Sequence, residues 1–282
     1  MGRLIQRRRI IRVTRTEGET TNGERRDTLA AEEPLELRMR GESFTVTMRT
    51  PGHDFELSAG FLVAEGILTD PGQLRSMRYC AGTDEAGNQT YNVIDADLDP
   101  ALAALALRDR RQVLTTSACG ICGTTSIDDV EKSLPPRRAE QLGISAETLL
   151  GLPDRLRNGQ QLFEKTGGVH AAGLFTGDGD MLCVREDVGR HNAVDKVVGR
   201  AFLDAHLPLT GTALQVSGRA SFELVQKAAL AGVELLSAVG APSSLAADLA
   251  DRAGITLVGF SRGASMNVYT HAHRISGIET GV

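Results

Sequence analysis

From about residue 167 to residue 262, short apolar runs alternate with segments whose apolar residues recur at helical spacing. The strand-like runs are GVHAAGLF, MLCVRED, TALQVSG, LLSAVGAPS and ITLVGFSRG. The helix-like segments are NAVDKVVGRAFL, SFELVQKAALAGVELL and SSLAADLADRAG. The predicted order is β-β-α-β-α-β-α-β, with the turn TGDGD joining the first two strands. This alternation indicates a mostly parallel sheet with helices on both faces, which is an α/β fold.

Boundary signals support the predicted helices. The first helix collects its apolar residues on one face: Val194, Val197, Val198, Ala201 and Phe202. Ser221 is the expected N-cap of the second helix, because a serine side chain can accept hydrogen bonds from the first-turn amides. The third helix should open at Ser243 or Ser244 and close at Gly254.

The whole chain divides into three predicted parts. Residues 1–114 form a smaller, β-rich α+β domain, with strands in PLELRMRG and SFTVTMRTPG, a helix in FELSAGFLVAEGIL and a polar loop over 18–29. Residues 115–140 form a flexible linker rich in Ser, Thr and Gly and broken by two prolines. Residues 141–282 form the second domain, which opens with a helical stretch interrupted near Pro153.

Composition excludes several classes of protein. The chain has 282 residues and a net charge of −5, so no general basic field is available to hold nucleic acid. Its apolar runs all fall short of the roughly 18 residues of a membrane span. The basic N-terminus lacks the apolar core of a secretion signal. We therefore expect a cytoplasmic protein that binds neither nucleic acid nor membrane.

The stretch TTSACGICGTTS carries Cys119 and Cys122 between glycines. A structural zinc site needs four ligands, and only His271 and His273 offer a second pair. A redox disulfide of the thioredoxin type needs a helix after the cysteines, which Gly-Thr-Thr does not favour. A sulfur carrier needs a reachable thiolate that can hold a persulfide, and the glycines allow such exposure. At this level all three interpretations stay open.

Polar residues also gather where predicted strands end. In REDVGRHNAVDKVVG, His191 and Asn192 stand at a strand-to-helix turn, where the helix N-terminus favours anions. Ligands of open α/β sheets bind outside the carboxyl ends of strands, so this turn is a candidate binding site.

Two similar loops, QVSGRAS and GFSRGAS, each combine Ser, Gly and Arg after a strand. Glycine amides, serine hydroxyls and the arginine fork suit a pyrophosphate or nucleotide. The candidate binding residues are those of the two loops: Ser217, Gly218, Arg219, Phe260, Ser261, Arg262, Gly263, Ala264 and Ser265. The stretch FEKTGGVHAAG adds Lys165, Gly167, Gly168 and His170 just before the first strand of this domain.

Taken together, TTSACGICG, FEKTGGVHAAG, REDVGRHNAVDKVVG, SGRASFELVQKA and GFSRGAS resemble the FdhD/NarQ family of formate dehydrogenase accessory sulfurtransferases. The resemblance covers nearly the whole chain in the family's motif order. It implies a sulfur carrier that takes sulfur from a cysteine desulfurase and passes it to the molybdenum cofactor. The cofactor, in its bis(molybdopterin guanine dinucleotide) form, is a bound substrate that apo-formate dehydrogenase then needs. A homodimer would offer one pocket to each of its two nucleotide arms.

The resemblance also assigns residues. It implies that Cys119 is the persulfide carrier, that Cys122 assists it and that residues 260–265 bind the guanine dinucleotide. It further implies a three-layer C-terminal domain related to cytidine deaminase. Zinc deaminases carry H-x-E and P-C-x-x-C at successive helix starts. The aligned segments GRHNAV and SGRASF lack that set, with no Glu two residues after His191, so we expect no structural metal and no deaminase activity.

Two rival functions remain open. One is a zinc-binding or non-catalytic chaperone of the cofactor, in which Cys119 and Cys122 would be metal ligands. The other is a dithiol oxidoreductase, in which the same two cysteines would form a reversible disulfide.

Overall fold

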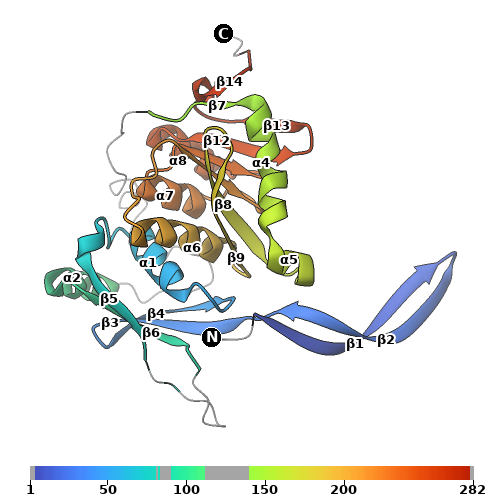
Figure 1. Cartoon of the computed structure of the whole chain (residues 1–282), viewed down its shortest axis with the longest axis horizontal. Coiled ribbons are helices and arrows are strands. Elements are labelled where there is room, and N and C mark those ends of the chain that lie inside the picture. The colour runs from blue at the N-terminus through green and yellow to red at the C-terminus, as the bar shows by residue number, and fades with distance from the viewer. Residues whose placement is uncertain (1–3, 81, 83–89, 112–139, 280–282) are drawn as a thin grey trace.

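The computed structural model describes residues 4–80, 82, 90–111 and 140–279. Its larger part is a six-stranded sheet with helices on both faces, and a four-stranded sheet lies below it in the view of Figure 1. A long two-stranded hairpin projects from the body. Within the described residues no helix has the length and apolar character needed to cross a membrane.

The six-stranded sheet has the order β13-β12-β11-β10-β8-β9. Its strands are β8 (His170–Thr176), β9 (Met181–Asp187), β10 (Thr212–Val216), β11 (Leu235–Ala238), β12 (Thr256–Arg262) and β13 (Ser265–Val268). The predicted strand and helix order is confirmed, and β13 adds one strand beyond the expected last one. The prediction of a mostly parallel sheet is wrong, because only β10–β11 and β11–β12 pair in parallel. Short turns join β8 to β9 and β12 to β13, and such turns can connect only antiparallel neighbours.

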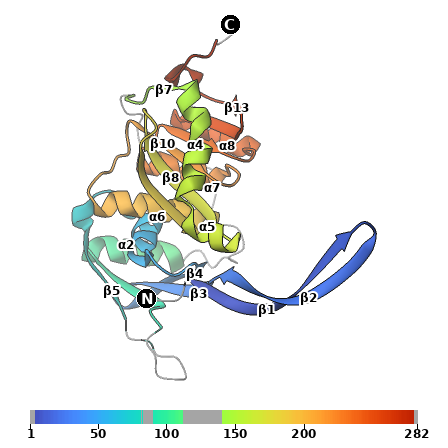
Figure 2. The same ribbon diagram turned by 45° about the vertical axis from the view of Figure 1, so that its right-hand side comes forward.

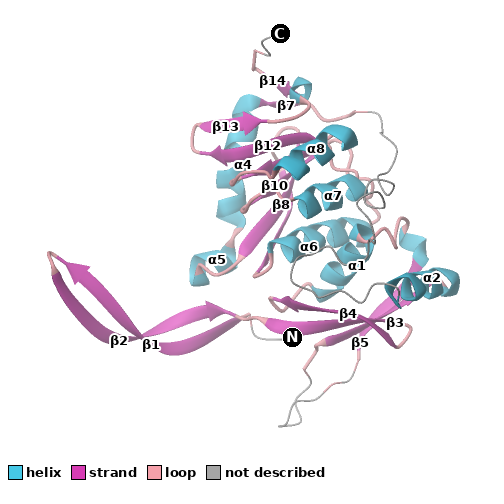
Figure 3. Cartoon of the chain, turned by 180° about the vertical axis from the view of Figure 1, so that it is seen from behind, coloured by secondary structure: helices cyan, strands magenta, loops and turns pink. Residues whose placement is uncertain are grey.

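Helices cover both faces of this sheet (Figures 1 and 3). One face carries α6 (Arg190–Leu203), α7 (Phe222–Ala231) and α8 (Ser244–Ala253), and the other carries α4 (Ala146–Gly159), which α5 (Gln161–Thr166) follows. Strand β8 shows why both faces are apolar: Ala171 and Phe175 belong to the core under α4, while Ala172 and Leu174 belong to the core under α6. Successive side chains of a strand point to opposite faces.

Helix α4 corrects one expectation. It runs without a break through Pro153, and the chain leaves the helix only at Gln160. Burial of Leu149, Leu152 and Leu156 against the sheet holds the helix together although proline removes one backbone hydrogen bond.

The four-stranded sheet has the order β4-β3-β6-β5. Its strands are β3 (Glu33–Met39), β4 (Glu42–Arg49), β5 (Leu74–Tyr79) and β6 (Val93–Leu98), and its helices are α1 (Asp54–Ala64) and α2 (Pro100–Arg111). Short elements complete the described chain: η1 (Pro71–Gln73), β7 (Ile144–Ser145), η2 (Ala272–Arg274) and β14 (Ile275–Ser276).

The expected polar loop over residues 18–29 is instead strand β2 (Glu19–Ala30), which pairs along its whole length with β1 (Ile5–Thr16). The polar composition of this stretch predicts a loop. Backbone pairing to β1 keeps a strand here even though no apolar face is buried.

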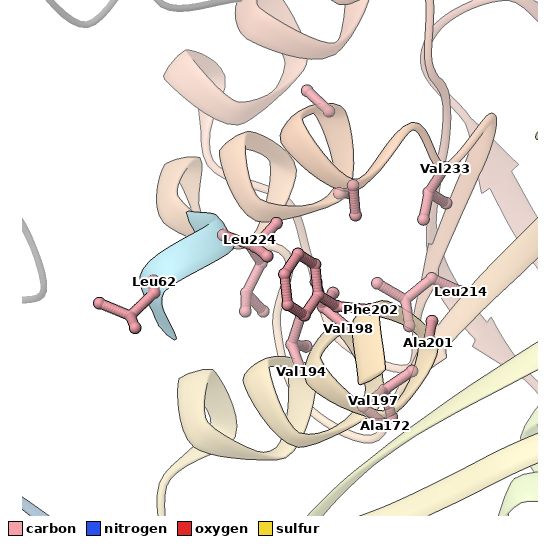
Figure 4. Close-up of a cluster of buried hydrophobic side chains, with 14 of the residues drawn as sticks. Leu62, Ala172, Val194, Val197, Val198, Ala201, Phe202, Leu214, Leu224 and Val233 are labelled. Atoms are coloured by element: carbon pink, nitrogen blue, oxygen red, sulfur yellow. The ribbon is translucent and has the colours of Figure 1, made fainter. Parts of the chain in front are cut away.

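The N-terminal and C-terminal parts meet where α1 crosses α6. A Cβ atom at Gly60 would lie 1.8 Å from the carbonyl oxygen of Asp195, and one at Gly199 would lie 1.8 Å from that of Glu56. Only glycine lets the two backbones approach this closely. One buried cluster therefore continues from Leu62 of α1 through Val194 and Phe202 of α6 toward the large sheet (Figure 4).

Candidate functional site

The carboxyl ends of four strands meet at one edge of the large sheet. Strands β9 and β10 both run antiparallel to β8, and β11 and β12 run parallel to β10. The chain therefore leaves β9, β10, β11 and β12 at the edge where β8 begins. We call this edge, with the segments 188–191, 217–221, 239–243 and 260–262 and the residue His170, the strand-end edge.

Gly240 joins the two similar loops of this edge. Its amide donates to the carbonyl of Gly218 over 2.9 Å, and its carbonyl accepts from the amide of Phe260 over 3.1 Å. A Cβ atom at Gly240 would lie 2.9 Å from Cγ of Arg219, so the loops are packed closely around it. The structure thus brings the two predicted loops together, across the turn that follows β11.

Strand β12 continues further than the sequence predicts, so the second loop begins later than expected. Phe260, Ser261 and Arg262 lie within β12, and the turn at Gly263 and Ala264 leads into β13. The pairing is irregular between Gly259 and Arg262, and Phe260 has a φ of 52°. At this bulge Phe260 is 36% exposed, and Arg262 is exposed as well.

Ser261 lies between these two exposed residues and is fully buried. Its hydroxyl has no hydrogen-bond partner among the described residues. A buried hydroxyl without a partner is unfavourable, so this position is suited to a ligand that supplies one.

His191 is held at the start of α6. Its Nε2 lies 3.3 Å from Oγ of Ser221 and 3.8 Å from the carboxylate of Glu223. Burial, with the positive charges of Arg190 and Lys227, lowers the pKa of His191 to about 4. The imidazole is therefore neutral at pH 7 and can accept a proton or a hydrogen bond.

Ser221 has a different task from the one predicted. It occupies the N-cap position of α7, but its side chain makes no cap hydrogen bond and lies against His191 instead. Sequence reasoning missed this pair because the two residues are thirty positions apart.

Asn192 points into the structure. Its side-chain amide donates to the carbonyl of Met48 over 2.7 Å and to Asp187 over 3.0 Å. Asp187 also pairs with Lys196 over 2.7 Å, and both side chains are almost fully buried. Lys196 in turn donates to the carbonyl of Thr50 over 2.9 Å. This network, which sequence reasoning missed, ties the segment after β4 to the strand-end edge.

A pocket of about 410 Å³ opens beside the strand-end edge, under α4 and α5. Gly167, Gly168 and His170 line it together with Ser217 and Gln160, and Lys165 does not. Burial and the charge of Arg190 lower the pKa of His170. The amide nitrogen of Gln160 is buried without a partner in the described part of the chain. The pocket therefore offers one unsatisfied side-chain amide, that of Gln160, to a ligand.

A sequence model of the FdhD/NarQ family matches residues 30–276. The chain belongs to this family. The proteins named "Sulfur carrier protein FdhD" from Streptomyces avermitilis and Nocardia farcinica are each 53% identical to it, covering 98% and 99% of this chain and 97% and 98% of their own lengths. The protein of the same name from Thermoplasma volcanium is 42% identical over 89% of this chain and 90% of its own length.

The fold also matches a solved structure. The crystal structure described as a candidate formate dehydrogenase accessory protein from Desulfotalea psychrophila has a TM-score of 0.73, at 24% sequence identity. The likeness covers 95% of this chain and 99% of that one. It supports the mixed α/β architecture of both parts of the chain.

Cys119 and Cys122 lie outside the described residues. The other two cysteines, Cys80 and Cys183, are partly buried, and burial raises the pKa of Cys183. The described residues contain no cluster of three or more His, Cys, Asp or Glu suited to a metal ion.

The two histidines considered as zinc ligands have partners of their own. Nε2 of His271 lies 2.9 Å from the carbonyl of Asp251, and Nε2 of His273 lies 2.8 Å from the carboxylate of Glu140.

Proposed function

We propose that this chain is a sulfurtransferase that carries sulfur as a persulfide on Cys119. The source is a cysteine desulfurase. The acceptor is the molybdenum cofactor in its bis(molybdopterin guanine dinucleotide) form, destined for apo-formate dehydrogenase. Family membership and the relatives named as sulfur carriers support this proposal. The convergence of the two Ser-Gly-Arg segments on Gly240 is the structural observation that favours a nucleotide-bearing acceptor.

Sulfur transfer needs no external oxidant in its first step. The Cys119 thiolate attacks the terminal sulfur of the desulfurase persulfide, a new S–S bond forms and the desulfurase thiolate leaves. In the second step the Cys122 thiolate attacks Sγ of Cys119. The outer sulfur leaves as hydrosulfide, which the molybdenum cofactor accepts. The electron pair comes from the two cysteines, which end as a disulfide that a cellular dithiol reduces.

The strand-end edge suits the nucleotide ends of the acceptor. The guanidinium groups of Arg219 and Arg262 can bind phosphate oxygens, and the exposed ring of Phe260 can stack on a base. The buried hydroxyl of Ser261 gains a partner when the site is filled. The turn at Gly263 and Ala264 then connects these residues to Ser265, the first residue of β13.

His191 and Asn192 take unequal parts in this proposal. The neutral imidazole of His191 is available to the substrate beside Ser221. Both contacts of Asn192 are internal, so it supports the edge from behind rather than binding substrate.

We infer further that the C-terminal part has a cytidine deaminase-like architecture whose zinc set is missing. The two helix starts that would carry that set in a deaminase are those of α6 and α7, and they meet at His191 and Ser221. Neither supplies a thiolate. The proposal also holds that the protein is cytoplasmic and forms a homodimer. Its two domains are residues 1–114 and 141–282, joined by a linker over residues 115–140.

Intact-mass analysis tests the carrier step. After incubation with a cysteine desulfurase and cysteine, the protein should gain one sulfur, about 32 Da, which dithiothreitol removes. Cys119→Ala should abolish the gain, while Cys122→Ala should keep it and block release of sulfide. No adduct on the unaltered protein, or an adduct that survives Cys119→Ala, contradicts the proposal. Bound zinc with both cysteines unreactive to alkylation would favour the chaperone instead.

A further inference from the structure

The hairpin β1–β2 is an arm outside the matched family region. Its strands pair without interruption from Ile5 with Ala30 to Thr16 with Glu19. Glu17 and Gly18 form the turn with φ values of 52° and 92°, a conformation that suits the twist of a two-stranded ribbon. Twelve residues per strand give a length of about 40 Å. Figures 1 and 2 show the arm extending away from both sheets, with only its base beside α5.

The arm is uncovered along most of its length. In β1 only Ile5 and Ile10 are even partly buried, while Ile11 is 69% exposed and Val13 is 64% exposed. A two-stranded ribbon without a covering layer is at best marginally stable in water. A surface of this kind is therefore expected to be covered in the working assembly.

The two faces of the arm differ in charge. Strand β1 carries five arginines and no acidic residue: Arg7, Arg8, Arg9, Arg12 and Arg15. One face carries every second residue, namely Arg7, Arg9, Ile11, Val13 and Arg15. On that face Arg9 stands directly opposite Arg26. Like charges in this position repel, and an acidic partner would relieve them.

The opposite face is more balanced. Arg8 stands directly opposite Asp27 there, and Arg12 stands opposite Gly23. The greater positive charge and the two exposed aliphatic side chains of β1 thus coincide on one face, which we call the arginine face; the exposed Leu29 of β2 stands opposite Gln6 on the other face.

We propose that the arginine face of the arm docks onto a second copy of this chain. The chain as a whole has a net charge of −5, whereas residues 5–30 are net positive, so the remaining residues are more acidic than the total. The arm and the body of another copy are therefore complementary in charge. The body also offers apolar contacts with acidic neighbours: Met181 and Leu182, both exposed, follow Asp178 and Asp180.

This inference rests on the proposed homodimer and adds its surface, but it is independent of the sulfur chemistry. Two copies that exchange arms would bury the arginine face of each, as a twofold axis requires. Because the electrostatic part is between exposed groups, added salt should weaken the association.

Analytical ultracentrifugation of the full chain tests the proposal. The unaltered protein should be a dimer whose Kd rises with salt. Arg9→Glu with Arg15→Glu should raise the Kd at least about tenfold, because like charges would then meet across the interface. Arg9→Glu places a carboxylate opposite Arg26, so the hairpin itself is not weakened.

Arg12→Glu with Arg25→Glu is the matched control, with the same charge change on the other face of the arm, where these two positions stand opposite Gly23 and Ile10 rather than opposite another charge. It should leave the Kd within about threefold. A monomeric unaltered protein overturns both the homodimer and the arm. A dimer that both double variants affect equally, or that neither affects, overturns the arm alone. Persulfide formation on Cys119 is read separately by mass.

Discussion

The α1–α6 crossing and the strand-end edge lie on the same helix but are built by opposite means. At the crossing, backbones touch at Gly60 and Gly199, and no side chain fits between them. At the edge, arginines are exposed and the hydroxyl of Ser261 is buried without a described partner. The helix crossing is fully packed by the chain's own atoms, whereas the strand-end edge has unpaired polar groups that a ligand can bind.

This difference separates residues that hold the fold from residues that bind. Asp187 and Lys196 lie between the two regions, because they tie the segment after β4 to the start of α6. Substitutions at the crossing should change stability, and substitutions at the edge should change binding with little change in stability.

Gly60→Ala should have the largest effect on stability. Its added methyl group would collide with backbone atoms of α6, which cannot move as a flexible side chain can. We expect a loss of at least about 3 kcal/mol in the free energy of unfolding, measured by chemical denaturation. Gly143→Ala is the control, because a Cβ atom there meets nothing within 4 Å. Equal stability of the two variants would refute the tight crossing.

Lys196→Met should come next. It leaves the Asp187 carboxylate buried without its ion-pair partner, at a cost of about 3–5 kcal/mol. Adding Asp187→Asn should recover part of that loss, since the unpaired charge is then gone. A double variant no more stable than Lys196→Met would show that the pair does not act as a unit.

The fold was largely predictable because its signals are local. Helix periodicity marked Val194 and Val197, and Ser243 capped α8 as expected. The alternation of strands and helices did not predict every strand direction. The short turn after β12 reverses the chain, so that β13 pairs antiparallel with β12. Strand β2 was not predicted, because neither of its faces is buried and it therefore has no apolar period.

The candidate site was predictable in part. The two Ser-Gly-Arg segments could be located because both carry turn residues after apolar runs. Their meeting depends on Gly240, which sits between them in space and has no motif of its own. The His191–Ser221 contact and the Asp187–Lys196 pair depend on packing between distant segments, which no local pattern records.

His191→Gln should give a moderate effect that depends on pH. The pKa of His191 is about 4 in the folded chain, below the ordinary value of 6.5, so the unfolded chain binds the proton more readily. The unaltered protein should therefore lose stability as pH falls from about 6.5 toward 4, and the variant should lose less. His206→Gln, at an exposed position, is the control. Parallel stability curves for His191→Gln and the unaltered protein would contradict a buried neutral imidazole.

Ser261→Ala should give the smallest effect on stability. Its hydroxyl has no described partner to lose, so the free energy of unfolding should stay within about 0.5 kcal/mol. If the hydroxyl binds the nucleotide, affinity should fall by about threefold to tenfold. A clear loss of stability would mean that the hydroxyl is already satisfied within the protein.

Calorimetric titration with guanosine diphosphate tests the central claim most directly, that the strand-end edge receives the nucleotide ends. The unaltered protein should bind, and Arg262→Ala should lower the affinity at least about tenfold with unchanged unfolding. Arg75→Ala, at an exposed arginine of β5, should bind as the unaltered protein does. Equal affinity for Arg262→Ala and the unaltered protein, or no binding to either, would contradict the account.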